Sequence, residues 1–209
     1  MSRGHDDDNV GKLSFPEPGD MLFLNQGDIS NIACLNFSPD AWIGYVEGYK
    51  RGADALVEHS LNSRGDRDYL IYPVVFLYRQ YLELQLKKLQ IYASTIQGGT
   101  GEYMMGHDLR GSWSRVRPFL ESCDVEQVEL DAVESLLVEF QEKDASFAYR
   151  YPESRQRTTS IPGVFHINIE HFRLIMAKLY AFFDAISMSL SVELQSSLET
   201  RYHSQTNDL

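Results

Sequence analysis

The chain has few cysteines and no long apolar run, and both absences limit what it can be. Only two of its 209 residues are cysteine, and the spacing of Cys34 and Cys123 fits no metal or redox motif. We therefore expect free thiols in a reducing, cytoplasmic compartment. No run of about 18 apolar residues occurs, which predicts no membrane span. Residues 1–8 lack the apolar core of a secretion signal, so secretion is not expected.

Basic residues are also scarce. The chain has 19 lysines and arginines against 30 aspartates and glutamates, a net charge of −11 at pH 7. This balance disfavours nonspecific binding to nucleic acid, which depends on neutralising phosphates. Arginines nevertheless gather in two segments, which are either solvated patches or parts of a phosphate-binding surface. The two groups are Arg110, Arg115 and Arg117, and then Arg150, Arg155 and Arg157.

What the chain does have is enough for one globular domain. A hydrophobic share of 43% with 23% charged residues is ordinary for a globular protein, and the length suits a single domain. Residues 1–20 contain an acidic run, glycines and prolines, and they predict a disordered arm. Residues 21–200 are expected to form one helical domain, and the polar residues 201–209 a frayed tail.

Helical periodicity fills this domain. Apolar residues recur at three- and four-residue steps, and no segment alternates with a period of two. We expect helices over five segments: residues 38–61, 68–93, 107–120, 125–144 and 168–198. The glycine-rich stretch after the second segment is expected to be a linker. These patterns predict an all-α bundle of about five helices, preceded by an irregular N-terminal arm.

Caps, prolines and apolar spacing give these helices more detail. We expect Ser38 to be the N-cap of the first helix, with Pro39 in its first turn. We expect Pro73 to mark an early turn or kink of the second helix, and Pro118 to end the third helix early. The helices are expected to bury stripes of apolar residues. These are Trp42, Tyr45, Val46, Tyr49, Ala53 and Leu56; Leu109, Trp113, Val116 and Leu120; Val128, Val133, Leu136, Leu137 and Phe140; and Phe172, Ile175, Leu179, Phe182, Phe183, Ile186 and Leu190.

The second helix is the most informative segment. Residues 72–89 are apolar on nearly every side, yet Arg79, Glu83 and Lys87 recur at four-residue spacing and therefore share one helical face. A helix that is apolar all round belongs in the middle of a protein. Because an isolated buried charge is too costly to keep, this stripe is either a structural polar network or the lining of a functional groove.

Three more residues extend this set. His107 and Asp108 lie at the start of the third predicted helix, and Arg150 follows the fourth. In one interpretation Asp108 caps the third helix, and the His107–Asp108 pair attaches that helix to Arg79 or Lys87. In the other, Arg79 and Arg150 contact phosphate in an open groove, and His107 acts as an acid or base.

Other motifs give no support for metal or cofactor chemistry. His166 and His171 are five residues apart, so on a helix they diverge by about 140°, and Asn168 is a plausible N-cap that would place His166 before the helix. The glycine cluster at 97–101 lacks the lysine of a phosphate loop. No Gly-x-Ser-x-Gly motif is present. We predict neither a metal nor a cofactor.

Three segments around the central charges resemble the HEPN-domain family, the higher eukaryote and prokaryote nucleotide-binding proteins. They are Phe76–Lys88, Gly106–Leu109 and Tyr149–Pro152, and a long final helix follows them. The resemblance covers most of the predicted helical domain. It implies a four- to five-helix up-down bundle.

The resemblance also implies functions. Many family members are metal-independent RNA-cleaving toxins or defence effectors, with an arginine and a histidine separated by four to six residues, usually across a homodimer interface. Others are noncatalytic and support a nucleotidyltransferase or bind nucleotides. The nuclease spacing is absent here, since seven residues separate Arg51 from His59 and eight separate Arg157 from His166. The leading expectation is therefore a cytoplasmic bacterial binding or partner module in phage defence or a toxin–antitoxin-like system.

Two alternatives remain, a metal-independent ribonuclease with a nonstandard site and a structural oligomeric scaffold. In the ribonuclease, His107 would be the acid or base, and Arg79 or Arg150 would stabilise the transition state. In a binding module, a set of polar residues would hold the ligand or the fold. This set is Arg79, Glu83, Lys87, His107, Asp108, Arg150 and Tyr151.

Partners follow from the same reasoning. Apolar and aromatic residues such as Tyr180, Phe182 and Phe183 exceed what one bundle is expected to bury, which predicts a homodimer. A protein from the same operon and RNA or a nucleotide are the other expected partners.

Overall fold

The computed structural model describes residues 15–144, 148–154, 156–163 and 166–207, and divides the chain into two compact units. The first unit, Met1–Leu35, contains one short 3-10 helix, η1 (Ile29–Asn31), in its described part. Asp28 caps η1 by accepting a hydrogen bond from the backbone N–H of Ser30. The second unit, Asn36–Leu209, contains the helices that position the candidate site.

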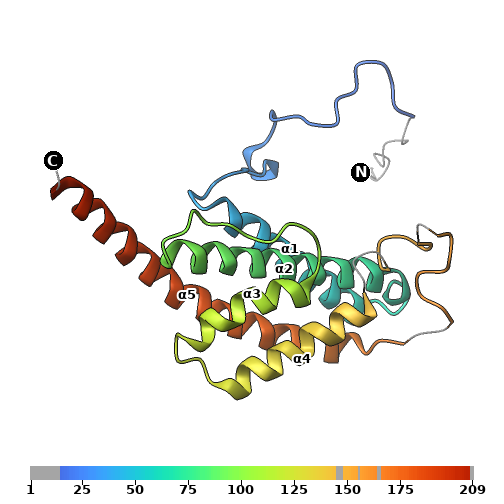
Figure 1. The fold of residues 1–209 in the computed structure, drawn as a ribbon. Coiled ribbons are helices and arrows are strands. Elements are labelled where there is room, and N and C mark those ends of the chain that lie inside the picture. Colours follow the sequence, from blue (N-terminus) through green and yellow to red (C-terminus); the bar gives the residue numbers. More distant parts are fainter. Residues whose placement is uncertain (1–14, 145–147, 155, 164–165, 208–209) are drawn as a thin grey trace, which may run out of the picture. The chain divides into compact units, whose positions relative to one another are not determined.

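The described residues of the second unit form five helices joined by turns and loops, with one isolated antiparallel bridge between Glu153 and Thr159 and no longer strand (Figure 1). The all-α prediction is therefore confirmed. The helices are α1 (Ala41–Asn62), α2 (Arg67–Ile96), α3 (Leu109–Glu121), α4 (Gln127–Lys143) and α5 (Ile169–Asn207).

Helix α2 is the centre of this unit. It packs against α1, α3 and α5, while α4 packs along α3. Val74, Leu82, Leu86 and Leu89 of α2 have no exposed surface, as expected for a helix that is apolar on nearly every side. Because α2 is surrounded, its charged stripe must be accommodated inside the bundle.

Helix α1 begins later than its sequence predicted. Its N-cap is Asp40, whose Oδ1 accepts from the backbone N–H of Trp42 at 2.9 Å. The hydroxyl of Ser38 accepts from the N–H of Asp40 instead, so Ser38 is not the cap and Pro39 precedes the helix. Aspartate is as good an N-cap as serine, and Asp40 lies closer to the apolar residues of α1 that recur at helical spacing. Tyr45, predicted to face inward, is 60% exposed.

Three further expectations need correction. Val128 is 72% exposed, whereas Leu130 is buried, because Leu130 lies three and seven residues before Val133 and Leu137 and shares their inner face. Pro118 does not end α3, which continues to Glu121. The proline releases only the carbonyl of Ser114, an exposed residue that water can reach. Helix α5 extends beyond the predicted end near residue 198, to Asn207.

Helix α5 is long and apolar enough over Ile169–Glu199 to cross a membrane by length and composition alone. The sequence had predicted no such segment. Its residues Leu179, Phe183 and Leu190 are buried against the other helices. Leu174, Met188 and Val192 are more than half exposed. The helix therefore contributes one side to the core and leaves apolar side chains on another.

Candidate functional site

Arg79 lies inside the bundle and connects three helices. Its side chain is on α2, and the residue is only 1% exposed. Its Nη2 donates to the backbone carbonyl oxygen of His107 and, at 3.2 Å, to Oε1 of Gln141 on α4. The same Oε1 accepts from the backbone N–H of Leu109, the first residue of α3, at 2.9 Å. Arg79 and Gln141 thus join α2, α4 and the start of α3.

The charge of Arg79 is balanced by carboxylates rather than by solvent. Burial lowers its pKa, and the charges of Asp144, Glu83 and Asp108 oppose that shift. Two of its nitrogens, Nε and Nη1, are buried without a hydrogen-bond partner within the described part of the chain. An arginine in this position stays protonated, and removing it would take one hydrogen-bond donor from the His107 carbonyl and one from Gln141.

Glu83, one turn further along α2, binds the side chains of Lys87 and His107. It is 3% exposed, and its Oε1 accepts from Nζ of Lys87 at 2.7 Å. Its Oε2 lies 2.9 Å from Nδ1 of His107. Lys87 is 9% exposed, and its Nζ lies 5.9 Å from the ring centroid of Tyr103. We call Arg79, Glu83, Lys87 and His107 the polar network.

His107 is the member of the polar network that reaches the surface. Its side chain is 49% exposed, whereas that of Glu83 is 4% exposed. The contact with Glu83 uses Nδ1, so Nε2 is the ring nitrogen left for a ligand or a reacting group. A carboxylate on one nitrogen fixes the orientation of an imidazole and favours the tautomer with a lone pair on the other. The geometry therefore suits acid–base or phosphate-binding chemistry at Nε2.

Asp108 occupies the N-cap position of α3, but its side chain makes no capping hydrogen bond. Its carboxylate lies over the first turn instead, where Oδ2 is 2.6 Å from the position that a Cβ at residue 111 would take. Gly111 is therefore the residue that makes room for it. An anion there is still favoured by the positive end of the helix. Asp108 therefore stabilises α3 through its charge and not through the predicted capping hydrogen bond.

Arg150 lies outside the core, beside α2. It is exposed, and its guanidinium carbon lies 5.5 Å from the ring centroid of Phe76 and 5.9 Å from that of Tyr151. Its charge also lowers the pKa of Arg79, although less than burial does. Contacts with aromatic faces orient the guanidinium without removing it from water. Arg150, unlike Arg79, can contact a phosphate at the surface.

The structure joins Arg79, Glu83, Lys87 and His107 in one network and places Arg150 and Tyr151 outside it. Arg79, Glu83 and Lys87 are buried, which favours the structural interpretation of the charged stripe over the groove. His107, Arg150 and Tyr151 are exposed. The first arginine group does not form a single basic patch, because Arg117 binds Glu121, Asp131 and Glu134. Arg155 of the second group lies outside the described residues.

Gln141 is the member of the site that the sequence did not indicate. It lies between exposed and buried positions on an acidic helix, and nothing in its spacing distinguishes it from a surface glutamine. Only the packing of α4 against α3 brings its Oε1 to Arg79 and Leu109. Gln90 of α2 has a similar role, since its Oε1 accepts from the N–H of Met104 at 2.8 Å.

The two histidines near the start of α5 lie as the sequence predicted. Asn168 precedes the helix and accepts from the N–H of His171 at 3.0 Å, so His166 stands before the first turn. Among the described residues, no group of three or more histidine, cysteine, aspartate or glutamate side chains could hold a metal ion. Cys34 and Cys123 are exposed free thiols.

Comparison with known proteins adds no relative. No protein-family model matches the chain, and neither a curated protein nor a solved structure shows significant similarity to it.

Proposed function

We propose that the chain is a HEPN-like binding or partner module, acting in bacterial phage defence or a toxin–antitoxin-like system, and that it binds RNA or a nucleotide beside His107. The all-helical fold supports this proposal, as do the contacts that join the first two HEPN-like segments in the polar network and the contact of Arg150, in the third segment, with Phe76 in the first. The observation that carries it is the half-exposed His107 ring attached through Nδ1 to the buried Glu83.

The ligand would be held by the exposed members of the site. His107 presents Nε2, and Arg150 presents a guanidinium that is oriented by Phe76 and Tyr151. Tyr151 is 58% exposed, so its ring can also stack on a base. Arg79 stays inside and fixes the His107 backbone rather than touching the ligand. Phosphate binding at one histidine and one arginine agrees with an acidic chain, because it needs no extended basic surface.

A second candidate function is a metal-independent ribonuclease with a nonstandard site. The His107–Glu83 contact favours it, because a carboxylate-oriented imidazole can accept the proton of a ribose 2′-hydroxyl. The 2′-oxygen would then attack the neighbouring phosphorus to form a 2′,3′-cyclic phosphate, and the 5′-oxygen of the next nucleotide would leave and take a proton from water. Arg150 would stabilise the charged transition state, since Arg79 is 1% exposed and already bonded to His107.

The third candidate is an oligomeric scaffold, and it shares one feature with the other two. We propose a homodimer in each case. The sequence predicted a dimer because of an excess of apolar and aromatic residues on the last helix, and that reason does not hold. Phe183 is fully buried, Phe182 packs against the core, and Tyr180 donates to Glu47 within the same unit. The exposed apolar side chains of α5 support the dimer instead.

RNA binding and cleavage in EDTA would test these proposals together. The probe is a fluorescein-labelled single-stranded RNA, followed by anisotropy for binding and by gel for cleavage. His59 offers a matched control, since its Nε2 lies 2.8 Å from Asp66 and its side chain is 57% exposed. We expect His107→Ala to weaken binding about tenfold, the loss of one charge-assisted contact, and His59→Ala to leave it unchanged.

The outcomes separate the three candidates. Binding without cleavage supports the module, and cleavage that is lost in His107→Ala but kept in His59→Ala supports the ribonuclease. A dimer that neither binds nor cleaves RNA, with a melting temperature that nucleotides do not change, supports the scaffold. Equal binding by wild type and His107→Ala would contradict the assignment of this site.

A further inference from the structure

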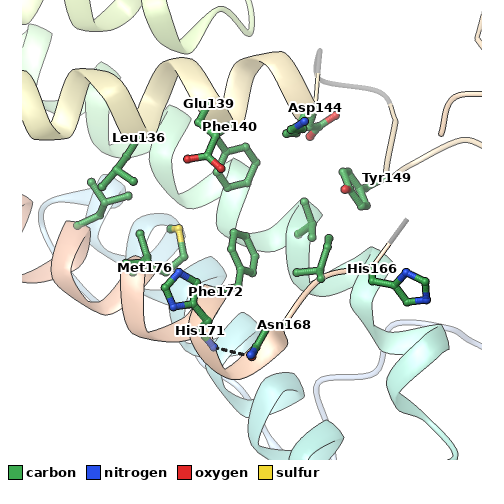
Figure 2. Close-up of a pocket in the computed structure, with 15 residues that line it drawn as sticks. Leu136, Glu139, Phe140, Asp144, Tyr149, His166, Asn168, His171, Phe172 and Met176 are labelled. Carbon is green, nitrogen blue, oxygen red and sulfur yellow. Dashed lines mark hydrogen bonds between the residues drawn. The ribbon is translucent and has the colours of Figure 1, made fainter. Parts of the chain in front are cut away.

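Two cavities along α5 differ in their polar lining, and neither has Arg79 or His107 among its lining residues. The first, of about 320 Å³ between α4 and α5, is lined mostly by apolar side chains (Figure 2). Several of its polar groups are already engaged within the protein. Asn168 accepts from the N–H of His171, and Lys143 and Asp144 also have partners. This α4–α5 cavity therefore indicates no preference for a charged ligand.

The second cavity, of about 290 Å³, lies between α1, α2 and α5. Its volume is close to the lower end of the roughly 300–1,000 Å³ that small-molecule pockets occupy. Helices α2 and α5 each contribute a polar stripe with steps of four, three and four residues, so each stripe follows one helical face. The stripe of α2 is Tyr81, Gln85, Lys88 and Tyr92, and that of α5 is Tyr180, Asp184, Ser187 and Ser191. Ile43, Val46 and Glu47 of α1 and Met188 of α5 complete the lining.

Gln85 holds the two stripes together. It is 4% exposed, and its Nε2 donates to the hydroxyl of Ser187 at 2.7 Å. The rings of Tyr81 and Tyr180 also meet, with centroids 6.0 Å apart and planes tilted by 40°. Because these contacts join α2 to α5 at the lining itself, the fold determines the shape of the cavity.

Tyr81 brings a buried hydroxyl to this cavity. The residue is 1% exposed, yet its hydroxyl makes no hydrogen bond within the described part of the chain. Tyr78 differs, because its hydroxyl donates to Asp54 at 2.7 Å. Buried hydroxyls are normally hydrogen-bonded. Since Tyr81 lines the cavity, its oxygen is available to a molecule bound there.

The charged side chains of the lining are not equally compensated. Nζ of Lys88 lies 3.7 Å from Oδ2 of Asp40, and Oε2 of Glu47 accepts from Nε of Arg51 at 3.2 Å. The side chain of Asp184, in contrast, makes neither an ion pair nor a hydrogen bond with the described residues. The lining therefore has one carboxylate whose charge no neighbouring cation offsets.

The surroundings of Tyr81 favour a cation over an anion. Burial raises the pKa of Tyr81, and the charges of Glu47 and Asp184 raise it further, so both carboxylates act on its hydroxyl. The phenol stays neutral, and its oxygen can accept a hydrogen bond from an ammonium group. Aromatic faces also attract cations. Lys50, which is not part of the lining, places its Nζ 4.3 Å from the ring centroid of Tyr180 in this way.

We propose that this cavity binds a small primary amine with a short apolar chain. The ammonium group donates to the carboxylate of Asp184 and to the oxygen of Tyr81, and the chain lies against Ile43, Val46 and Met188. The one uncompensated carboxylate accounts for the preference for a single positive charge. The proposal does not depend on RNA or nucleotide binding at His107.

NMR titration of the full chain with hexylamine tests the proposal, with hexanol and hexanoate as probes of the same chain length. We expect saturable shifts with hexylamine, weaker binding of hexanol and no saturable binding of hexanoate. Asp184→Asn keeps the shape but removes the charge, and it should weaken hexylamine binding about three- to fivefold and leave hexanol unchanged. Glu193→Gln is the matched control, since Glu193 is also exposed on α5 but is not part of the lining.

The hydroxyl has its own pair of variants. Tyr81→Phe should weaken hexylamine binding about two- to tenfold, the loss of one hydrogen bond. It should not lower the melting temperature, because this hydroxyl has no bond to lose within the described part of the chain. Tyr78→Phe removes an equally buried hydroxyl that is bonded to Asp54 and lies outside the lining, so it should leave hexylamine binding unchanged.

Met188 connects this site to the proposed homodimer. It is 65% exposed and belongs to the side of α5 that we propose to be covered by a second copy. The titration is therefore repeated with Val192→Glu, whose added charge should separate the dimer, and this variant should bind hexylamine at least as tightly as the wild type. No saturable hexylamine binding by either protein, hexanoate binding as tightly as hexylamine, or binding unaffected by both Asp184→Asn and Tyr81→Phe would overturn the proposal.

Discussion

At the scale of single residues, one arginine explains why charge is tolerated in the centre of the bundle. Arg79 combines a hydrogen bond to the His107 carbonyl with one to Gln141, and the carboxylates of Asp144 and Glu83 offset its burial. A buried charge remains stable only while these partners are present. Arg79 therefore holds the backbone of His107 in place, while the His107 side chain remains exposed to solvent.

Replacing Arg79 should be costly. Arg79→Met keeps the length but removes the charge and both hydrogen bonds, and we expect it to lower the free energy of unfolding by about 3 kcal/mol. Arg51→Met is the control, because the Arg51 side chain is 77% exposed and pairs with Glu47 on the surface of α1. It should change stability by less than about 0.5 kcal/mol. Urea denaturation measures both, and equal effects would contradict the structural role of Arg79.

Tyr78 should make stability depend on alkaline pH. Burial, together with the hydrogen bond from its hydroxyl to Asp54, raises the pKa of Tyr78 well above its usual range. Below about pH 10 the phenol is protonated in both states; above it, the unfolded chain loses this proton while the folded protein keeps it. Stability should then fall with rising pH, and Tyr78 contributes about 1.4 kcal/mol per pH unit to that slope.

Urea denaturation between pH 8 and pH 11 measures this slope. Tyr78→Phe removes this titrating group, so the free energy of unfolding of the variant should fall less steeply with rising pH than that of the wild type. Tyr69→Phe is the control, because Tyr69 is 77% exposed. An unchanged slope in Tyr78→Phe would show that this phenol titrates alike in both states.

At the scale of helices, the sequence predicts which segments are helical better than it predicts where each helix ends or which side faces the core. The charged, otherwise apolar stretch of α2 was identified as central because no other position could bury all its sides. The inner face of α4 was misjudged at Val128, since that helix is acidic and weakly patterned near its start. The predicted end of α3 at Pro118 is wrong, because water can bind the Ser114 carbonyl that the proline leaves without an N–H donor. Such outcomes depend on which side of a helix meets solvent, which only packing decides.

Gln141 should act as the connection between helices α2, α3 and α4. Gln141→Ala leaves the N–H of Leu109 and one donor of Arg79 without their acceptor, and the expected loss is about 1–3 kcal/mol. Glu142→Ala, at the next and exposed position, should be nearly neutral. Hydrogen exchange measured by NMR should show faster exchange at the Leu109 amide in Gln141→Ala. Unchanged exchange there would contradict this role.

At the scale of the whole molecule, the exposed side of α5 should decide the oligomeric state. Val192→Glu places a charge among apolar side chains that we propose to be covered in a homodimer, so it should yield monomers. Val128→Glu is closely matched, since Val128 is 72% exposed and Val192 is 69% exposed, but it lies on α4. It should leave the dimer intact. Light scattering after size-exclusion chromatography gives the masses, and a monomeric wild type would contradict the dimer.

The candidate site was only partly visible in the sequence. Four-residue spacing placed Arg79, Glu83 and Lys87 on one face, and this holds in the structure. The spacing did not show that Arg79 would bind a backbone carbonyl, nor that Gln141 would join it, because both contacts span long separations along the chain. The α4–α5 cavity was also not evident, since its apolar residues fit the pattern of an ordinary core. Contacts between helices of different orientation leave no periodic signal.

The most direct test of the central claim is NMR of the imidazole nitrogens during titration with single-stranded RNA. The claim is that His107, oriented by Glu83, contacts the ligand, while the carboxylate-bound His59 on α1 does not. We predict that the His107 signals shift and saturate with RNA, and that the His59 signals stay constant. RNA binding that leaves the His107 signals unchanged, or shifts both histidines equally, would contradict the account.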